Sequence, residues 1–195
     1  ANDQWTAPVT ISAGNNWFVN WADYPVIASD ANGNMLAHFL QKSDTAKFTY
    51  DVKITASADN GKTWSIPTVL HDDGKKAEHG FVSIIPYNDQ YMVSWLDGRK
   101  TAMEGDHNGH EGHHGEMTLR GALLDKKGTK TNEWELDGRI CDCCQTTIAI
   151  TDNGPVVVYR DRSNEEIRDM SIVRFVNGEW TQPKTIFPDE WKIAG

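Results

Sequence analysis

Two clusters of potential metal ligands stand out in the sequence. The segment 106–117 carries four histidines, acidic residues and a methionine, separated by glycines that let the chain fold back. A second cluster, Cys141-Asp142-Cys143-Cys144, places three thiols within four residues. Imidazole suits zinc, copper and nickel, and a nearby thioether or thiolate favours copper. With copper or zinc as the expected ion, the candidate ligands are His107, His110, His113, His114, Met117, Cys141, Cys143 and Cys144.

Both clusters have other interpretations. The histidine segment fits no fixed zinc motif, so a low-complexity insert that binds metal only incidentally is an alternative. An odd number of clustered cysteines forms no closed set of disulfides. In an oxidising compartment these cysteines would pair with distant partners, since adjacent cysteines rarely pair with each other. Inert buried thiols are the third interpretation.

The elements that must position these residues read as strands. Most segments between turn signals alternate apolar and polar residues, which is typical of an all-β protein. Three strand–turn–strand pairs look alike, and each is followed by a third strand and a Trp-led fourth strand. The pairs cover 26–40, 81–96 and 147–160, the third strands cover 52–56, 117–123 and 170–175, and the fourth strands begin at Trp64, Trp134 and Trp180.

Repeats of this kind are typical of propeller blades. We expect an outer strand of a preceding blade in 1–15, and four-stranded antiparallel blades in 16–75, 76–139 and 140–195. Propellers typically have about four to eight blades, so further blades or a second chain would have to close the ring. In such a blade order, both metal-ligand clusters lie in loops that share one face.

The turn at 57–64 matches the pattern S-x-D-x-G-x-T-W at every position. Its polar side chains can bond the turn's own backbone, its glycine can take a positive φ, and its tryptophan can cover the turn. The turn resembles the Asp-box of sialidase-like (BNR-repeat) β-propellers, with structural positions at Ser57, Asp59, Gly61, Thr63 and Trp64. Segments 78–83, 95–99, 141–146, 157–163, 168–171 and 191–195 resemble a group of bacterial Asp-box propeller proteins with a Cys-Asp-Cys-Cys motif.

The resemblance implies about half of a six-bladed propeller, followed by another cysteine and further blades. Sialidases are exo-acting glycoside hydrolases whose arginines hold a sugar carboxylate through bidentate bonds. Their Arg-Ile-Pro signature is absent here, and Tyr24-Pro25 stands roughly where it would be expected. The resemblance places Asp97, Arg99, Asp161 and Arg162 as candidate catalytic residues, and Trp21, Asp23, His79 and Arg160 as candidate substrate-binding residues. Ordinary solvated loop ends are the alternative for each of them.

Three functions follow as alternatives: a sialidase-like hydrolase or anionic-sugar-binding protein, a copper or zinc protein, and a scaffold for protein partners. The net charge of −9 argues against nucleic acid and anionic membranes as partners. No apolar run approaches the roughly 18 residues of a membrane span. The start Ala1-Asn2-Asp3 would suit a mature secreted form, so a periplasmic or secreted location is expected.

Overall fold

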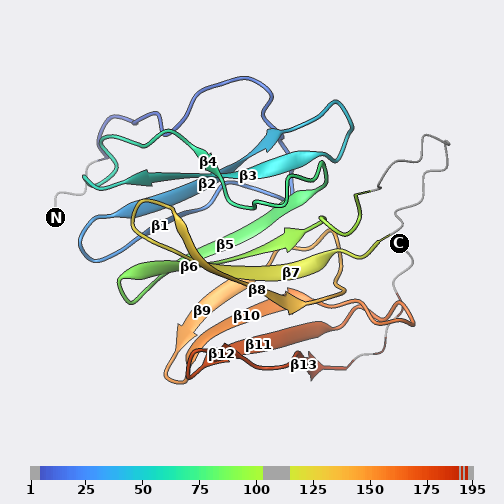
Figure 1. Cartoon of the computed structure of the whole chain (residues 1–195). Helices are drawn as coiled ribbons and strands as arrows, with labels where there is room; N and C mark the ends of the chain where they lie inside the picture. The colour runs from blue at the N-terminus through green and yellow to red at the C-terminus, as the bar shows by residue number, and fades with distance from the viewer. Residues whose placement is uncertain (1–4, 103–114, 189, 191, 193–195) are drawn as a thin grey trace.

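The computed structural model describes residues 5–102, 115–188, 190 and 192. Within these residues the chain forms strands and turns without a helix, and no helix that could span a membrane is found there. Three antiparallel sheets follow one another along the chain and in space (Figure 1). The all-β, antiparallel part of the prediction is therefore confirmed.

Each sheet comes from one continuous stretch of chain. Neighbouring strands follow the sequence order, except that β13 pairs with β11. Sheet 1 contains β1 (Ile27–Ser29), β2 (Met35–Lys42), β3 (Tyr50–Ser57) and β4 (Thr68–Val69). Sheet 2 contains β5 (His79–Tyr87), β6 (Gln90–Asp97), β7 (Thr118–Leu124) and β8 (Lys130–Asp137). Sheet 3 contains β9 (Thr147–Thr151), β10 (Gly154–Arg160), β11 (Met170–Val176), β12 (Glu179–Trp180) and β13 (Lys184–Phe187).

The outer strands differ most from the sequence-based expectation. Pro67 and Pro183 lack the N–H that a sheet ladder needs. In sheet 1 the outer strand pairs only after Pro67, at β4, and in sheet 3 the outer strand is split by Pro183 into β12 and β13. The outer strand of sheet 2 contains no proline and runs unbroken, with Trp134 inside it rather than at its start. The range 1–15, expected to hold the outer strand of a preceding blade, contains no strand among its described residues, 5–15.

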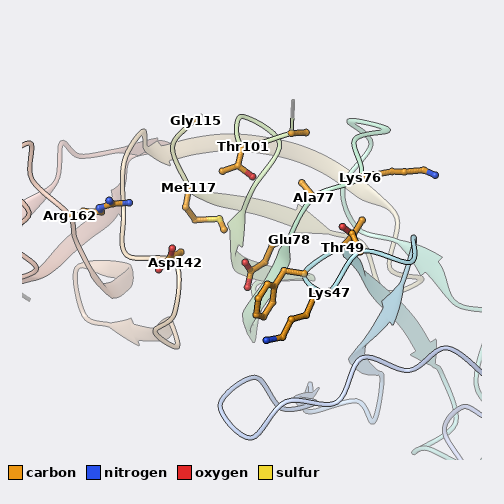
Figure 2. A pocket seen from close by; sticks show the side chains of 13 residues that line it. Lys47, Thr49, Lys76, Ala77, Glu78, Thr101, Gly115, Met117, Asp142 and Arg162 are labelled. Atoms are coloured by element: carbon orange, nitrogen blue, oxygen red, sulfur yellow. The ribbon is translucent and has the colours of Figure 1, made fainter. Parts of the chain in front are cut away.

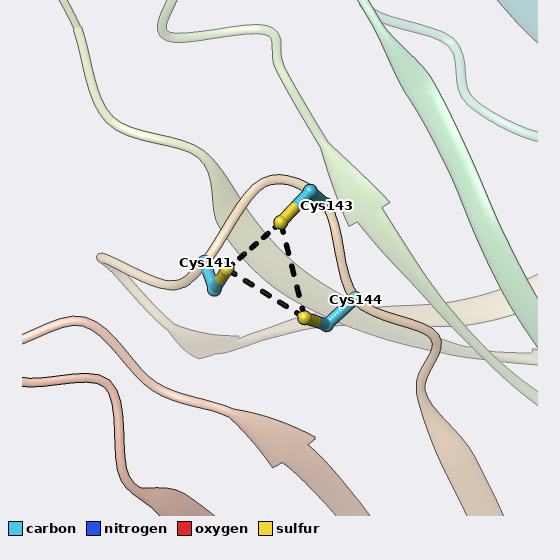
Figure 3. A group of neighbouring side chains, drawn as sticks. All are labelled: Cys141, Cys143 and Cys144. Carbon is cyan, nitrogen blue, oxygen red and sulfur yellow. Dashed lines mark hydrogen bonds between the residues drawn. The ribbon is translucent and has the colours of Figure 1, made fainter. Parts of the chain in front are cut away.

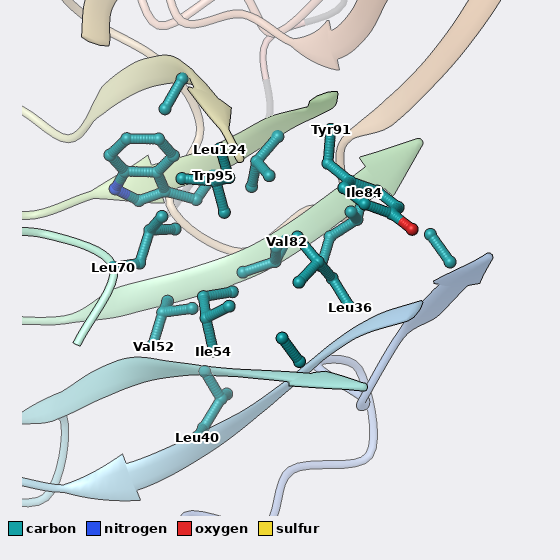
Figure 4. Packing of buried hydrophobic residues seen from close by; sticks show 14 of the residues in the cluster. Leu36, Leu40, Val52, Ile54, Leu70, Val82, Ile84, Tyr91, Trp95 and Leu124 are labelled. Atoms are coloured by element: carbon teal, nitrogen blue, oxygen red, sulfur yellow. The ribbon is translucent and has the colours of Figure 1, made fainter. Parts of the chain in front are cut away.

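Two apolar cores lie on opposite faces of sheet 2. Because successive side chains of a strand point to opposite faces, β6 divides its residues between them. Tyr91, Val93 and Trp95 belong to the core shared with sheet 1 (Figure 4). Met92 and Leu96 belong to the core shared with sheet 3. Sheet 2 is thus covered on both faces, and it fixes the positions of the other two sheets.

Specific hydrogen bonds also join the sheets, in addition to the apolar packing. The Tyr91 hydroxyl donates to the Asn34 carbonyl oxygen at 2.6 Å, joining sheets 2 and 1. The Ser94 and Thr146 hydroxyls lie 3.1 Å apart between sheets 2 and 3. The first strands are also in contact, β1 with β5 and β5 with β9. The loops that precede these strands are therefore brought together, and they carry the cysteine cluster.

Candidate functional site

The three cysteine sulfurs form a compact triangle in the loop between β8 and β9 (Figure 3). The Sγ of Cys141 lies 3.4 Å from that of Cys143 and 3.8 Å from that of Cys144, and the third side measures 3.9 Å. A disulfide would require about 2.05 Å between sulfurs. The cluster therefore presents three separate sulfur donors aimed at a common point.

Both ends of this loop are anchored. The Cys141 N–H donates to the Arg160 carbonyl oxygen at 3.1 Å, next to the Ile140–Asp161 bridge. At the other end, the Gln145 side-chain amide donates to the Val82 carbonyl oxygen at 2.8 Å. These bonds fix the backbone before and after the three thiols, so the triangle rests on sheets 2 and 3 rather than on a free loop.

The thiols differ in their surroundings. Cys141 is buried, Cys144 is half-buried and Cys143 is exposed. Despite burial, the pKa of Cys141 is lowered to about 5, mainly by the hydrogen bond with Cys144 and to a smaller extent by the charge of Arg168. The Arg168 Nη1 lies 3.8 Å from the Cys141 sulfur. The same contact with Cys141, together with burial, raises the pKa of Cys144, so Cys141 ionises first.

A groove opens beside the cluster at the loop ends of the three sheets (Figure 2). Its cavity volume is about 320 Å³. Asp142 lines this groove, and it stands between two of the cysteines in the chain. Acidic, basic and apolar side chains share the wall, among them Lys47, Phe48, Lys76, Glu78, Met117 and Arg162. The groove thus offers a mixed-charge approach to the cysteine loop.

A second polar cluster is buried between sheets 1 and 2. The His71 and His79 rings stack with centroids 3.6 Å apart. Asp73 bridges them, with one oxygen 3.3 Å from His71 Nδ1 and the other 2.9 Å from His79 Nε2. The Arg99 Nε lies 2.7 Å from Asp97 Oδ1, and Asp97 is fully buried. Arg99 and His79 both pair with Asp73 and Asp97, so this cluster is an ion-pair network.

The charges in this network follow from its contacts. Burial opposes the charged form of His79, but the hydrogen bond to Asp73 and the Asp97 charge outweigh it and raise the His79 pKa. Burial and then the nearby charge of His79 lower the pKa of His71. As the pH falls, His79 is therefore protonated before His71.

The sequence-predicted catalytic and substrate-binding residues are not gathered in one place. Arg162 alone among these eight lines the groove, and its Nε lies 2.8 Å from Glu166. Asp161 accepts a bond from the Ser171 hydroxyl, and Arg160 donates to the Arg168 carbonyl oxygen. Asp97, Arg99 and His79 belong to the ion-pair network described above. The Trp21 side chain is almost fully exposed to solvent.

The remaining predicted substrate residue, Asp23, is buried. Its Oδ2 accepts from the Phe81 N–H at 2.8 Å, and Phe81 has a positive φ of 53°. Burial raises the pKa of Asp23 to about 7. Asp23 thus ties the loop before β1 to an irregular point of β5, away from solvent.

The predicted metal ligands divide in the same way. The three cysteines converge, and Met117 lies buried at the wall of the groove. The predicted ligands His107, His110, His113 and His114 lie outside the described residues. Sequence reasoning missed Arg168 as a neighbour of Cys141, and it missed His71 and Asp73. Their signal was position alone: His71 and Asp73 lie in the 70–78 loop that leads to His79, the first residue of β5.

The turn at 57–64 has a dense set of local bonds. Asp59 Oδ1 accepts from the Lys62 and Thr63 N–H groups at 3.0 and 2.9 Å. The Ser57 Oγ accepts from the Gly61 N–H at 2.9 Å, and Gly61 has a φ of 78°. The Trp64 indole N–H donates to the Gly61 carbonyl oxygen at 3.1 Å. The polar groups of this turn, which follows β3, are therefore satisfied by bonds within the turn itself.

No protein-family model and no curated protein matches the chain. Among solved structures, β-1,2-mannobiose phosphorylase from Listeria innocua is similar at 12% identity and a TM-score of 0.43, over 80% of this chain and 41% of that one. A protein of unknown function from Dyadobacter fermentans is similar at 13% identity and a TM-score of 0.36, over 91% and 71%. This chain therefore spans less than half of the phosphorylase, and similarities this weak carry no functional argument.

Proposed function

We propose that this chain is part of a β-propeller protein that binds a soft metal ion, copper(I) or zinc(II), through Cys141, Cys143 and Cys144. The observation that carries the proposal is the spacing of the sulfurs. With metal–sulfur bonds of about 2.3 Å, three thiolates around a tetrahedral or trigonal ion lie roughly 3.8–4.0 Å apart. Two of the separations in the cluster are 3.8 and 3.9 Å, and the third is 3.4 Å. Only a small adjustment of Cys143 separates this triangle from a coordination sphere.

The surroundings of the triangle help to balance the charge of a three-thiolate site. Three thiolates bring three negative charges, and a monovalent or divalent ion leaves an excess of at least one. The Arg168 guanidinium next to Cys141 offsets part of this excess. Because Cys143 is exposed, the ion would be reachable from solvent. These features fit an exchangeable site better than a closed structural one.

The propeller part of the proposal rests on the stacking of the sheets. The contacting first strands β1, β5 and β9 would surround a propeller axis. The face of sheet 1 turned away from sheet 2 carries an apolar groove lined by Ile11, Trp17, Ile27 and Phe39. Further blades or a second chain would cover such a face. A periplasmic or secreted location belongs to the same proposal.

Metal titration of reduced, tag-free protein tests the thiolate site. We expect one zinc or copper(I) ion per chain at the cluster, and a cobalt(II) derivative with intense sulfur-to-metal charge-transfer absorption. Changing all three cysteines to serine should abolish that absorption. A variant with His107, His110, His113 and His114 changed to alanine is the matched control, because it removes the other ligand cluster. Unchanged binding in the serine variant would contradict the proposal.

Binding of an anionic sugar is a second candidate function. Three cations, Lys47, Lys76 and Arg162, line the same groove, and Phe48 offers an apolar ring beside them. The cavity volume of about 320 Å³ lies at the lower end of the range for small-molecule sites. Calorimetric titration with glucuronate and N-acetylneuraminate tests this candidate. If Arg162→Met binds these sugars as tightly as the wild-type chain does, this candidate function is contradicted.

A further inference from the structure

The three thiols of the cluster differ in how easily a small oxidant can reach them. The Cys141 side chain is only 1% exposed, whereas Cys143 is exposed. A molecule arriving from solvent therefore meets the Cys143 sulfur first. The neighbouring Cys141 sulfur is then the nearest group that can react with whatever forms there, at 3.4 Å.

Covalent geometry selects one of the three sulfur pairs. Cys143 and Cys144 are adjacent, and adjacent Cα atoms across a trans peptide are about 3.8 Å apart, below the roughly 4.4 Å that disulfides need. The two pairs that include Cys141 escape this restriction. Of these, the pair with Cys143 is closer, at 3.4 Å against 3.8 Å for Cys144. Oxidation therefore favours a Cys141–Cys143 bond.

We propose that Cys143 is a thiol–disulfide exchange site, and that a reversible Cys141–Cys143 disulfide controls the occupancy of the metal site. This inference rests on the metal-binding function proposed above for its consequence, although the exchange itself does not require a metal. A metal that loses two of its three sulfur ligands has a single thiol left in the cluster. Oxidation would therefore release the ion, and reduction would restore the site.

The exchange needs only a small-molecule disulfide such as oxidised glutathione. Cys143 loses its proton, and its thiolate attacks one sulfur of the small disulfide. The S–S bond of that molecule breaks, and the thiolate that leaves takes up a proton. The Cys141 sulfur then attacks the Cys143 sulfur of the mixed disulfide and expels the second thiol. Two cysteine thiols lose two electrons and two protons, and the small disulfide gains both as two thiols.

The anchored loop ends are suited to this movement. The Cys141 backbone is held by Arg160, and Gln145 is held by Val82. The sulfurs must approach by roughly 1.3 Å to reach the disulfide length of about 2.05 Å. Cys143, which lies between the two anchors, can supply this movement through its exposed side chain. The anchors then keep Cys144 in place for renewed coordination.

Oxidised glutathione added to reduced, zinc-loaded full chain tests the inference. We expect a Cys141–Cys143 disulfide by peptide mapping, two equivalents of reduced glutathione, and release of about one zinc ion per disulfide to a chromogenic chelator. Cys144→Ser should still form the bond, whereas Cys143→Ser should not. Dithiothreitol should restore zinc binding in the wild-type chain.

The possible outcomes separate the two proposals. Retained zinc with three reduced thiols, or a disulfide between another pair, overturns the exchange site. If the reduced chain binds no zinc at the cluster but still forms the Cys141–Cys143 disulfide, the metal-binding function fails while the exchange site stands. Circular dichroism of each serine variant confirms that the fold is retained, so that a missing disulfide is not a folding defect.

Discussion

The buried Asp97 carboxylate gives the sharpest test of what holds sheets 1 and 2 together. It accepts from Arg99 Nε at 2.7 Å, from Arg99 Nη2 at 2.8 Å and from the Trp95 indole N–H at 2.8 Å. Its side chain is fully buried. Asp97→Asn keeps the shape and one acceptor oxygen, but it leaves Arg99 without its closest counter-ion and removes one of the two carboxylates beside His79, the other being Asp73.

The expected loss in the free energy of unfolding is about 3–5 kcal/mol at pH 7, the usual cost of removing one partner of a buried ion pair. Asp73 and Glu133 also contact Arg99, at 3.3 and 3.0 Å, so the lower end of this range is expected. Burial alone would raise the pKa of Asp97, but the bonds from Arg99 and the charge of His79 outweigh it and lower the pKa. The stabilisation is therefore present above about pH 4, the unfolded-state value, and is lost as the pH falls further.

Urea denaturation followed by tryptophan fluorescence measures this loss at pH 7 and again below pH 4. The matched control is Asp89→Asn, because Asp89 is 96% exposed and pairs with Lys126 at the surface. Exposed pairs contribute about 0–1 kcal/mol, so the control should change little. A loss below about 1 kcal/mol for Asp97→Asn would refute the argument that a buried charge network joins the sheets.

Two further substitutions probe the junction of the β1 loop with β5. Asp23→Asn should remove a pH dependence: burial raises the folded pKa to about 7, so the wild-type stability present below about pH 4 is lost as the pH rises towards 7. The urea concentration at the midpoint of unfolding should therefore fall less steeply between pH 4 and 8 in the variant than in the wild type. The same pH dependence in both proteins would contradict this prediction. Gly80→Ala should destabilise the fold by about 1–3 kcal/mol, because a Cβ there would lie 2.1 Å from Asp23 Oδ2. Gly14→Ala, where the nearest atom is 4.0 Å away, is the control, and equal thermal shifts for the two would count against the close contact.

The strands inside each sheet could be predicted from the sequence, because burial on one or two faces leaves an alternating or continuous apolar pattern. The third strand of sheet 3 was expected at 170–175 and is observed as Met170–Val176. Outer strands were less predictable, because a tryptophan marks the turn region but pairing depends on proline positions. The two short outer pieces β12 and β13 flank Pro183 for this reason.

The candidate site was predictable where its residues are close in sequence. Cys141, Cys143 and Cys144 needed only a turn to converge. Contacts between distant residues left no such trace in the sequence. Arg168 reaches Cys141 across 27 positions, and the carboxylates that contact Arg99, which are Asp73, Asp97 and Glu133, come from three separate segments. From the sequence, the charged loop residues were predicted to bind a ligand. In the structure several of them form ion pairs with one another.

The central position of sheet 2 also has a consequence for how the chain folds as it is synthesised. Hydrogen-bonded strand pairs are local in each sheet, so sheet 1 can pair its strands once residue 69 has emerged. Its apolar face, with Leu36, Val52 and Ile54, has no cover until β5 and β6 follow. During that interval the nascent chain exposes an apolar surface to which chaperones can bind and through which chains can aggregate. Slow translation between residues 70 and 97 would lengthen this exposure, so codon usage in that stretch bears on the yield of folded protein.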